Sequence, residues 1–212
     1  LGQDITVTEI SYFGWCHKFN SAGNMIAISS PNWVTVWQLN NETWEQVGTP
    51  FAEGFGYEID MSSDGSIVAA SNGSGNAFNV NARVYKYING TWTQLGQDLH
   101  PSADYYSELI NDQFISVYGR NIALNSAGNI LAMGDYGCKY FAGEFRIWEY
   151  INGTWVQQAL FEGEYLIEET MGSSIALNSA GDTCAVTCKR EGIGAPAFIR
   201  IYQNINGTWA ET

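Results

Sequence analysis

A tetrapeptide that recurs along the chain constrains its fold more than any other feature. Asn-Gly-Thr-Trp occurs at residues 89–92, 152–155 and 206–209, and a degenerate copy, Asn-Glu-Thr-Trp, occupies residues 41–44. A second phrase, Asn-Ser-Ala-Gly or a close variant, precedes each copy, at residues 20–23, 62–65, 125–128 and 178–181. Two phrases that recur in the same order indicate one supersecondary unit copied four times, as in propellers and solenoids.

The length of the chain requires these units to share burial. Dividing 212 residues among four units leaves 53 for each, which is too few for four independent cores. We therefore expect a single domain over residues 1–212, with approximate repeats at 6–51, 52–99, 100–160 and 161–212.

The third unit shows most clearly which secondary structure the repeat encodes. Two apolar runs, residues 121–124 and 129–133, lack a polar face, as is typical of strands buried on both sides. Residues 144–150 alternate between two environments, and Asn152-Gly153 then predicts a type I′ hairpin turn before a fourth strand at 154–158. We predict an all-β, four-bladed β-propeller of four-stranded antiparallel blades. A linear β-solenoid is the rival fold, although its rungs are usually shorter and its strands parallel.

The start of the chain repeats a phrase from its middle. Residues 95–99 read Leu-Gly-Gln-Asp-Leu, and the chain begins Leu1, Gly2, Gln3, Asp4, Ile5, whereas the last unit stops at Thr212 soon after Trp209 without this phrase. We expect residues 1–5 to complete the outer edge of the last blade, beside Trp209–Thr212. Within one chain this would close the ring, whereas between copies it would build a polymer by strand addition to an open edge. A third possibility is that the chain is cut from a longer array.

The repeat resembles two kinds of β-propeller repeat. Ile-Ala-Leu-Asn-Ser-Ala-Gly-Asn-Ile-Leu-Ala-Met at 122–133, followed by Phe-Arg-Ile-Trp at 145–148, is similar to WD-type and FG-GAP (integrin-α-like) repeats. Phe-Gly or a related pair stands where an FG-GAP repeat has its Phe-Gly, at residues 13–14, 55–56, 118–119 and 171–172. The resemblance implies a propeller scaffold of the kind used in extracellular adhesion or protein interaction. The Asp-rich calcium loop and the Gly-His and Trp-Asp pairs of these families are absent, so their specific functions do not transfer.

The charge of the chain limits its partners. The net charge is −13 at pH 7, from 22 acidic and 9 basic side chains, and such a field repels nucleic acids and anionic lipid surfaces. No apolar run approaches the length of about eighteen residues that a membrane helix needs, so we expect no membrane insertion. The chain begins at Leu1 with no visible signal peptide, so either a leader was removed or this is a portion of a longer chain. Together with the sequons and cysteines, these features lead us to expect an extracellular or cell-surface location.

Five sequons fit the N-glycosylation acceptor pattern, at Asn41, Asn72, Asn89, Asn152 and Asn206. All except Asn72 fall at the predicted outer hairpin turn, where a glycan would stand clear of the core. Because the same turn also favours Asn for its backbone conformation, glycosylation and a purely structural role both remain open.

The four cysteines, Cys16, Cys138, Cys184 and Cys188, permit two disulfides. Cys184 and Cys188 would lie roughly 13 Å apart on one extended strand, beyond the reach of a disulfide. By repeat alignment, Cys188 lies at a strand end and Cys138 in the equivalent loop of the preceding unit. We therefore expect a Cys138–Cys188 bridge, with four buried thiols as the alternative.

Little in the sequence indicates catalysis. Carboxylates cluster in the longest connections between units, where a pair could hydrolyse glycosides, although a solvated acidic loop is the simpler explanation; they are Asp104, Glu108, Asp112, Glu162, Glu164, Glu168 and Glu169. A zinc site would need His17 or His100 to be joined by Cys16 or by distant carboxylates. We therefore predict no catalytic residues, no metal and no cofactor, and do not expect an enzyme.

The tryptophans complete the functional hypothesis. Trp44, Trp92, Trp155 and Trp209 recur with the repeat, so we expect them to pack between blades, whereas Trp15 and Trp33 lie off this register and could form a carbohydrate-binding face. We expect a non-enzymatic extracellular structural, assembly or adhesion module with a protein partner. The most specific version of this hypothesis is that the chain is the protomer of a fibre joined by N-terminal strand addition. The alternative is a lectin-like propeller that binds glycans.

Overall fold

The computed structural model describes residues 2–7, 10–72, 82–100, 121–136, 142–164, 170–189 and 197–212, and within them the chain forms four antiparallel sheets of four strands. We call these sheets blades 1 to 4. Blade 1 comprises β1 (His17–Phe19), β2 (Met25–Ser30), β3 (Trp33–Asn40) and β4 (Thr43–Gln46). Blade 2 comprises β5 (Glu58–Met61), β6 (Ile67–Ser71), β7 (Ala82–Ile88) and β8 (Thr91–Gln94). Blade 3 comprises β9 (Asn121–Leu124), β10 (Ile130–Asp135), β11 (Glu144–Ile151) and β12 (Thr154–Glu162). Blade 4 comprises β13 (Ile175–Leu177), β14 (Thr183–Lys189), β15 (Ala197–Ile205) and β16 (Thr208–Glu211).

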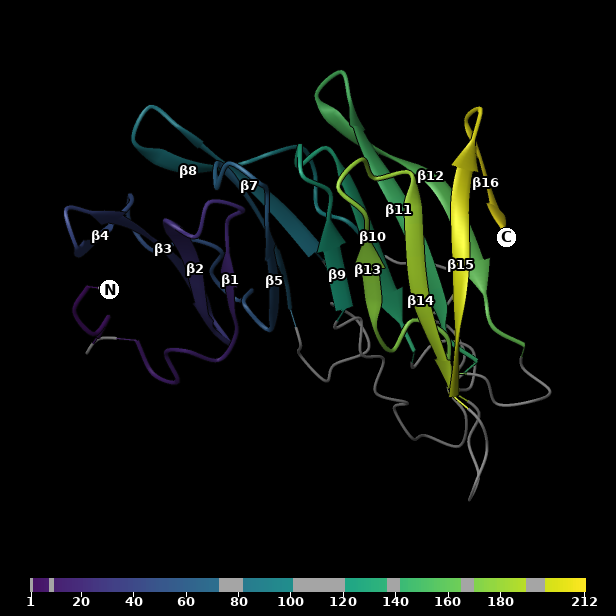
Figure 1. Ribbon diagram of the computed structural model, residues 1–212, viewed down its shortest axis with the longest axis horizontal. Coiled ribbons are helices and arrows are strands. Elements are labelled where there is room, and N and C mark those ends of the chain that lie inside the picture. Colours follow the sequence, from purple (N-terminus) through teal and green to yellow (C-terminus); the bar gives the residue numbers. More distant parts are fainter. Residues whose placement is uncertain are drawn as a thin grey trace.

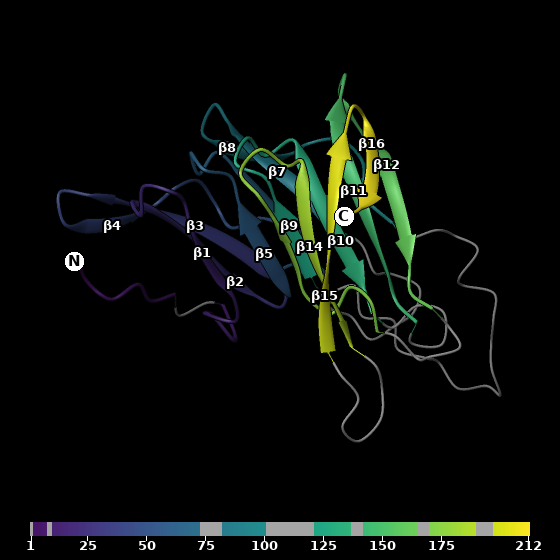
Figure 2. The ribbon, with the colours of Figure 1, turned by 45° about the vertical axis from the view of Figure 1, so that its right-hand side comes forward.

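The blades follow one another in an arc, with blade 1 and blade 4 at opposite ends (Figure 1, Figure 2). Strand order within each sheet is the order along the chain, and the first strands of successive blades contact one another, β1 with β5, β5 with β9 and β9 with β13. The first strands therefore lie inside and the fourth strands outside. This radial arrangement of four-stranded antiparallel sheets is that of a β-propeller, which confirms the predicted fold class. None of the described residues forms a helix long and apolar enough to cross a membrane.

The outer hairpins have the predicted turn. Asn89 and Gly90 both adopt positive φ, at 50° and 89°, and the equivalent residues of blades 3 and 4 do the same. Two central residues with positive φ define the type I′ turn, whose twist matches that of the flanking strands. In blade 1 the degenerate copy keeps this geometry although Glu42 replaces the Gly, with φ of 66°.

The core lies between the blades. One apolar layer joins blade 1 to blade 2 around Val36 and Val68, a second joins blade 2 to blade 3 around Val84 and Leu131, and a third joins blade 3 to blade 4 around Ile147. Blades 2 and 3 therefore each use one face of the sheet against the blade before and the other face against the blade after. This explains why the second strands read as continuous apolar runs.

The N-terminal segment contacts blade 1. Gln3 Nε2 donates to Trp44 O at 3.0 Å, and Gln3 Oε1 accepts from Trp44 N at 3.0 Å, whereas blade 4 lies at the other end of the arc (Figure 1). That residues 1–5 complete the outer edge of a last blade, in particular that of a neighbouring copy, stays a prediction. The phrase binds the outer hairpin of the blade that follows it in sequence. Gln97 shows this a second time, because it accepts from Trp155 N at 3.0 Å and donates to Trp155 O at 2.6 Å.

Candidate functional site: the axial pocket and the two end faces

The turn after the first strand of each blade forms a ladder of backbone hydrogen bonds across the arc. Ser21 N–H donates to Ser63 O at 3.1 Å, Ser63 N–H to Ser126 O at 2.9 Å, and Ser126 N–H to Ser179 O at 3.1 Å. The Ser21 and Ser63 hydroxyls also bond each other, at 2.8 Å. The sequence analysis did not identify this ladder, although the Ser that recurs at the second position of every Asn-Ser-Ala-Gly-like phrase was a signal for it.

The Asn side chains of this phrase fix the turns that carry the ladder. Asn20 Oδ1 accepts from the backbone N–H groups of Asn24 and Met25, at 3.1 and 3.0 Å. Asn125 does the same for Asn129 and Ile130, at 3.0 and 2.9 Å. The side chain therefore satisfies backbone donors that the turn would otherwise leave unpaired.

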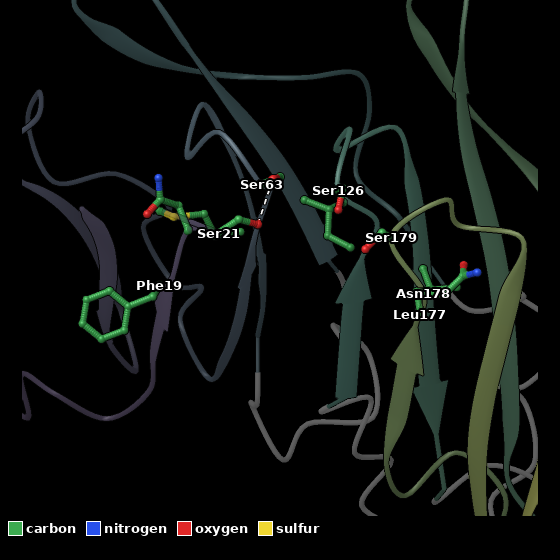
Figure 3. A pocket seen from close by; sticks show the side chains of 10 residues that line it. Phe19, Ser21, Ser63, Ser126, Leu177, Asn178 and Ser179 are labelled. Carbon is green, nitrogen blue, oxygen red and sulfur yellow. Dashed lines mark hydrogen bonds between the residues drawn. The ribbon is translucent and has the colours of Figure 1, made fainter. Parts of the chain in front are cut away.

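A shallow pocket of about 160 Å³ lies over this ladder (Figure 3). Its lining comes from the first strands and turns of all four blades: Phe19, Asn20, Ser21, Met61, Ser63, Leu124, Ser126, Leu177, Asn178 and Ser179. None of these lining side chains is an acid or base near neutral pH. The pocket can offer hydroxyl and amide hydrogen bonds to a ligand but no general acid or base.

Blade 4 exposes a face that the other blades bury. Ile201 lies opposite Ala185 in the β14–β15 register, as Ile147 lies opposite Ala132 in blade 3. Ile147 is fully buried by the next blade, whereas Ile201 is 37% exposed and Ile199, two residues before it, is 64% exposed. We call this surface, formed by Ala176, Ala185, Ile199 and Ile201, the tail face.

Blade 1 exposes the other face of its sheet, the face that blades 2 to 4 pack against the preceding blade. Phe19 and Trp37 lie in one cross-strand row with Ile26, and the matching row of blade 2 contains Met61 and Tyr85. Phe19 is 53% exposed, whereas Met61 is buried against blade 1. We call the surface formed by Gly14, Phe19, Gly23 and Trp37 the head face.

The space around equivalent glycines is a second observation, separate from side-chain exposure, that distinguishes the head face of blade 1. A Cβ on Gly65 would meet Met25 Sδ of the preceding blade at 2.6 Å, and one on Gly128 would meet Ile67 Cδ1 at 2.7 Å. At the equivalent position in blade 1, a Cβ on Gly23 would meet nothing within 4 Å. The same contrast holds for the Phe-Gly pairs, because a Cβ on Gly56 would clash with Ser30 O while Gly14 faces open space.

Titratable groups gather on the inner strands of blades 1 and 2. Asp60 Oδ2 accepts from Leu124 N–H at 2.7 Å, Lys18 Nζ lies 3.8 Å from Asp60 Oδ1, and Cys16 Sγ lies 3.8 Å from Glu58 Oε1. Burial raises the pKa of Asp60, of Glu58 and of the Cys16 thiol. This hydrogen bond to Leu124 links blade 2 to blade 3, so the Asp60 carboxylate has a structural role. No group of three or more metal-ligating side chains forms among the residues that the structure describes.

The predicted cysteine bridge stays a prediction, because Cys138 lies outside the described residues. Cys184 and Cys188 both lie in β14, as the sequence argument assumed, and no disulfide joins any two of the described cysteines. Cys184 is fully buried, and this burial raises the pKa of its thiol to about 12.

The other predicted site residues are spread over the molecule. Asn41, Asn89, Asn152 and Asn206 are exposed at the outer turns, whereas Asn72 is 8% exposed at the end of β6. Of the carboxylates in the long connections, the structure describes Glu162 and Glu164 alone; the remainder lie in segments that are not described.

The recurring tryptophans have the expected packing role in the middle of the arc. Trp92 Nε1 donates to Val47 O at 2.8 Å, and Trp155 Nε1 donates to Leu95 O at 2.7 Å. Each therefore binds the segment that follows the outer strand of the preceding blade. Trp15 is 49% exposed and packs against Tyr57 with the ring centroids 5.2 Å apart.

Comparison with known proteins supports the architecture. No family model matches the chain, so the FG-GAP or WD assignment is not confirmed, and no curated protein matches it in sequence. Among solved structures, the chain is similar to a hypothetical selenium-binding protein from Sulfolobus tokodaii, with a TM-score of 0.62 and 11% identity over 94% of this chain and 53% of that one. It is also similar to a candidate 6-phosphogluconolactonase from Bacteroides fragilis, with a TM-score of 0.56 and 14% identity over 93% of this chain and 52% of that one. A third similar structure is TolB from Acinetobacter baumannii, with a TM-score of 0.50 and 14% identity over 91% of this chain and 41% of that one.

These likenesses define the class of protein as a β-propeller-type repeat protein. The chain spans about half the length of the first two structures and less of the third. At 11–14% identity the likeness extends to the fold alone.

Proposed function

We propose that this chain is a non-enzymatic, extracellular assembly module that binds protein through the open ends of its arc. The observation that carries the proposal is the tail face, where Ile199 and Ile201 are exposed although the residues at the same positions in blades 1 to 3 are buried. Contiguous apolar surface of this kind marks a protein-interaction site. The tail face is apolar, as are the buried strand positions on which the other blades dock, so it is suited to packing against another β-sheet of this kind.

Two further features support this proposal. The axial pocket offers no acid or base to a substrate, which favours binding over catalysis. The exposed sequons lie at the outer hairpins, so glycans there would surround the rim and leave both end faces accessible. We retain assembly from the sequence analysis and extend it to the blade faces. The contact of Gln3 with Trp44 is compatible with strand addition, because the equivalent Gln97 binds Trp155 while Leu95 and Leu99 bond to their own blade.

Sedimentation velocity tests the proposal. Over about 1 to 100 µM, where interfaces of moderate affinity dissociate, we expect the mass to rise above 23.4 kDa with concentration. The rise should be absent in the doubly substituted Ile199→Asn, Ile201→Asn variant. A wild-type chain that stays monomeric over the whole range contradicts assembly through these faces.

A lectin-like role is the second candidate, because Trp15 offers half of its surface beside the ring of Tyr57. Exposed aromatic rings stack on the apolar faces of sugars. A glycan array probed with wild type and Trp15→Ala tests it. Binding that depends on Trp15 supports the lectin, and the absence of any binding at about millimolar affinity rejects it.

A further inference from the structure

We infer that the partner of the tail face is the head face of a second copy of this chain, docked head to tail so that the interblade packing and the serine ladder continue across the junction. This inference rests on the proposed assembly function and specifies its partner. It is carried by three observations, on the ladder, on the glycines and on the apolar residues of the two faces.

The serine ladder has two complementary ends. Every step runs from an N–H of one blade to a carbonyl of the next blade, from Ser21 through to Ser179. Among the described residues, the ladder therefore ends with the Ser179 N–H as an unused donor and the Ser21 carbonyl as an unused acceptor. A tail face that meets a head face pairs these two groups, whereas two tail faces would bring donor against donor.

The head face also has the shape of a docking surface for a tail face. At Gly65, Gly128 and Gly181, the lack of a side chain admits the preceding blade to within van der Waals contact. Gly23 also lacks a side chain, and in this structure a Cβ there would meet nothing within 4 Å. A blade that docks on the head face as blade 1 docks on blade 2 would therefore meet no obstructing Cβ at Gly23 or at Gly14.

The apolar residues of the two faces complement each other in the way that the internal interfaces do. Tyr202 packs edge-on against Phe145 of blade 3, with ring centroids 4.8 Å apart. Trp37 occupies the position of Tyr202 in blade 1, and Ile199 occupies the position of Phe145 in blade 4. Docking would thus place an aromatic ring on an aliphatic side chain at the same point of the interface.

A head-to-tail pair of arcs can close into a ring. Two arcs contain eight blades, within the range of known propellers. In such a ring each copy uses its tail face once and its head face once.

A complementation experiment tests the pairing. The tail variant carries Ile199→Asn and Ile201→Asn, and the head variant carries Phe19→Gln; all three changes leave the charge unaltered and create no sequon. The matched control is Ile205→Asn, because Ile205 is 57% exposed and the equivalent Ile88 and Ile151 stay exposed at 44% and 37% even though a blade follows them. Circular dichroism and thermal unfolding verify that each variant is folded, as expected for changes at exposed positions.

We expect wild type and the control to reach twice 23.4 kDa by light scattering, and each variant alone to be monomeric, with a dissociation constant raised at least tenfold. An equimolar mixture of the two variants should recover a dimer, because one intact tail face then meets one intact head face. If the head variant dimerises alone, or if the mixture stays monomeric while wild type assembles, the head-to-tail pairing is wrong and assembly by another geometry stands. If wild type is monomeric, both proposals fail.

Discussion

At the scale of single residues, charged groups in this protein stabilise contacts within or between blades. Arg83 and Asp98 pair at 2.7 Å within blade 2 and its following segment, and the guanidinium lies 4.1 Å from the centroid of the Phe55 ring. Asp60 accepts from a backbone N–H of the next blade and also lies 3.8 Å from Lys18 Nζ of the preceding blade. The first carboxylate has a lowered pKa and the second a raised pKa, so they contribute to stability in opposite pH ranges.

Asp98→Asn should destabilise the fold at neutral pH by about 1 kcal/mol, the upper range for a partly exposed pair. Hydrogen bonding to Arg83 lowers the pKa of Asp98 below its ordinary value of 3.8. The stabilisation is therefore present above pH 3.8 and is lost as the pH falls through the lowered folded-state pKa. Urea unfolding at a series of pH values should show the difference from wild type shrinking in acid, and a difference that stays constant would contradict this role.

Asp60→Asn should be at least as stable as wild type at pH 7, whereas Asp60→Ala should lose about 1–3 kcal/mol because Leu124 N–H is left unpaired. Burial raises the pKa of Asp60, so its contribution is full below the unfolded-state value and is lost as the pH rises through the folded-state pKa. The amide keeps an acceptor for Leu124 and removes this dependence. Equal losses in the two variants would show that the hydrogen bond to Leu124 is not what Asp60 provides.

At the scale of elements, each blade is attached to the next by the segment that follows its outer strand. Gly48 lies against the indole of Trp92, and Gly96 lies against that of Trp155. The carbonyls of the residues just before these glycines accept the indole N–H hydrogen bonds. The Leu-Gly-Gln phrase is therefore a contact between consecutive blades.

Gly96→Ala should destabilise the protein more than Gly90→Ala does. Both glycines have positive φ, 78° and 89°, so each alanine costs about 1–2 kcal/mol for the left-handed backbone. A Cβ on Gly96 would also approach Trp155 Cδ1 to 2.8 Å, whereas Gly90 has open space, and overpacking adds about 1–3 kcal/mol. Denaturant unfolding measures both variants, and equal losses would show that the tryptophan contact tolerates the added methyl group.

At the scale of the whole molecule, the proposed assembly must overcome repulsion between copies that each carry a net charge of −13. The end faces attract through apolar burial, which salt does not screen, whereas the repulsion is screened within a Debye length of about 10 Å at 0.1 M salt. Raising the ionic strength should therefore strengthen dimer formation, measured as a lower dissociation constant in sedimentation equilibrium. Weaker association at high salt would indicate an interface held by ion pairs, which the tail and head faces do not contain.

Local sequence determined the blades. The alternation of Phe145 and Ile147, the Asn-Gly turns and the apolar second strands predicted the strands and hairpins correctly, because strand periodicity and turn conformation depend on residues close together in the chain. The packing role of Trp92 and Trp155 was predictable for the same reason, since a residue that recurs with the repeat repeats its environment.

The tertiary structure alone decided how the ends are used. The phrase at residues 1–5 matched residues 95–99, but the sequence did not show that such a phrase makes two sets of contacts. Leu95 and Leu99 bond to their own blade, and Gln97 binds Trp155 of the next blade. Exposure of Ile201 and the open space at Gly23 likewise follow from the position of a blade in the arc. All four copies encode nearly the same sheet, so the sequence specifies a face that can be buried, and the position of the blade in the arc determines whether it is.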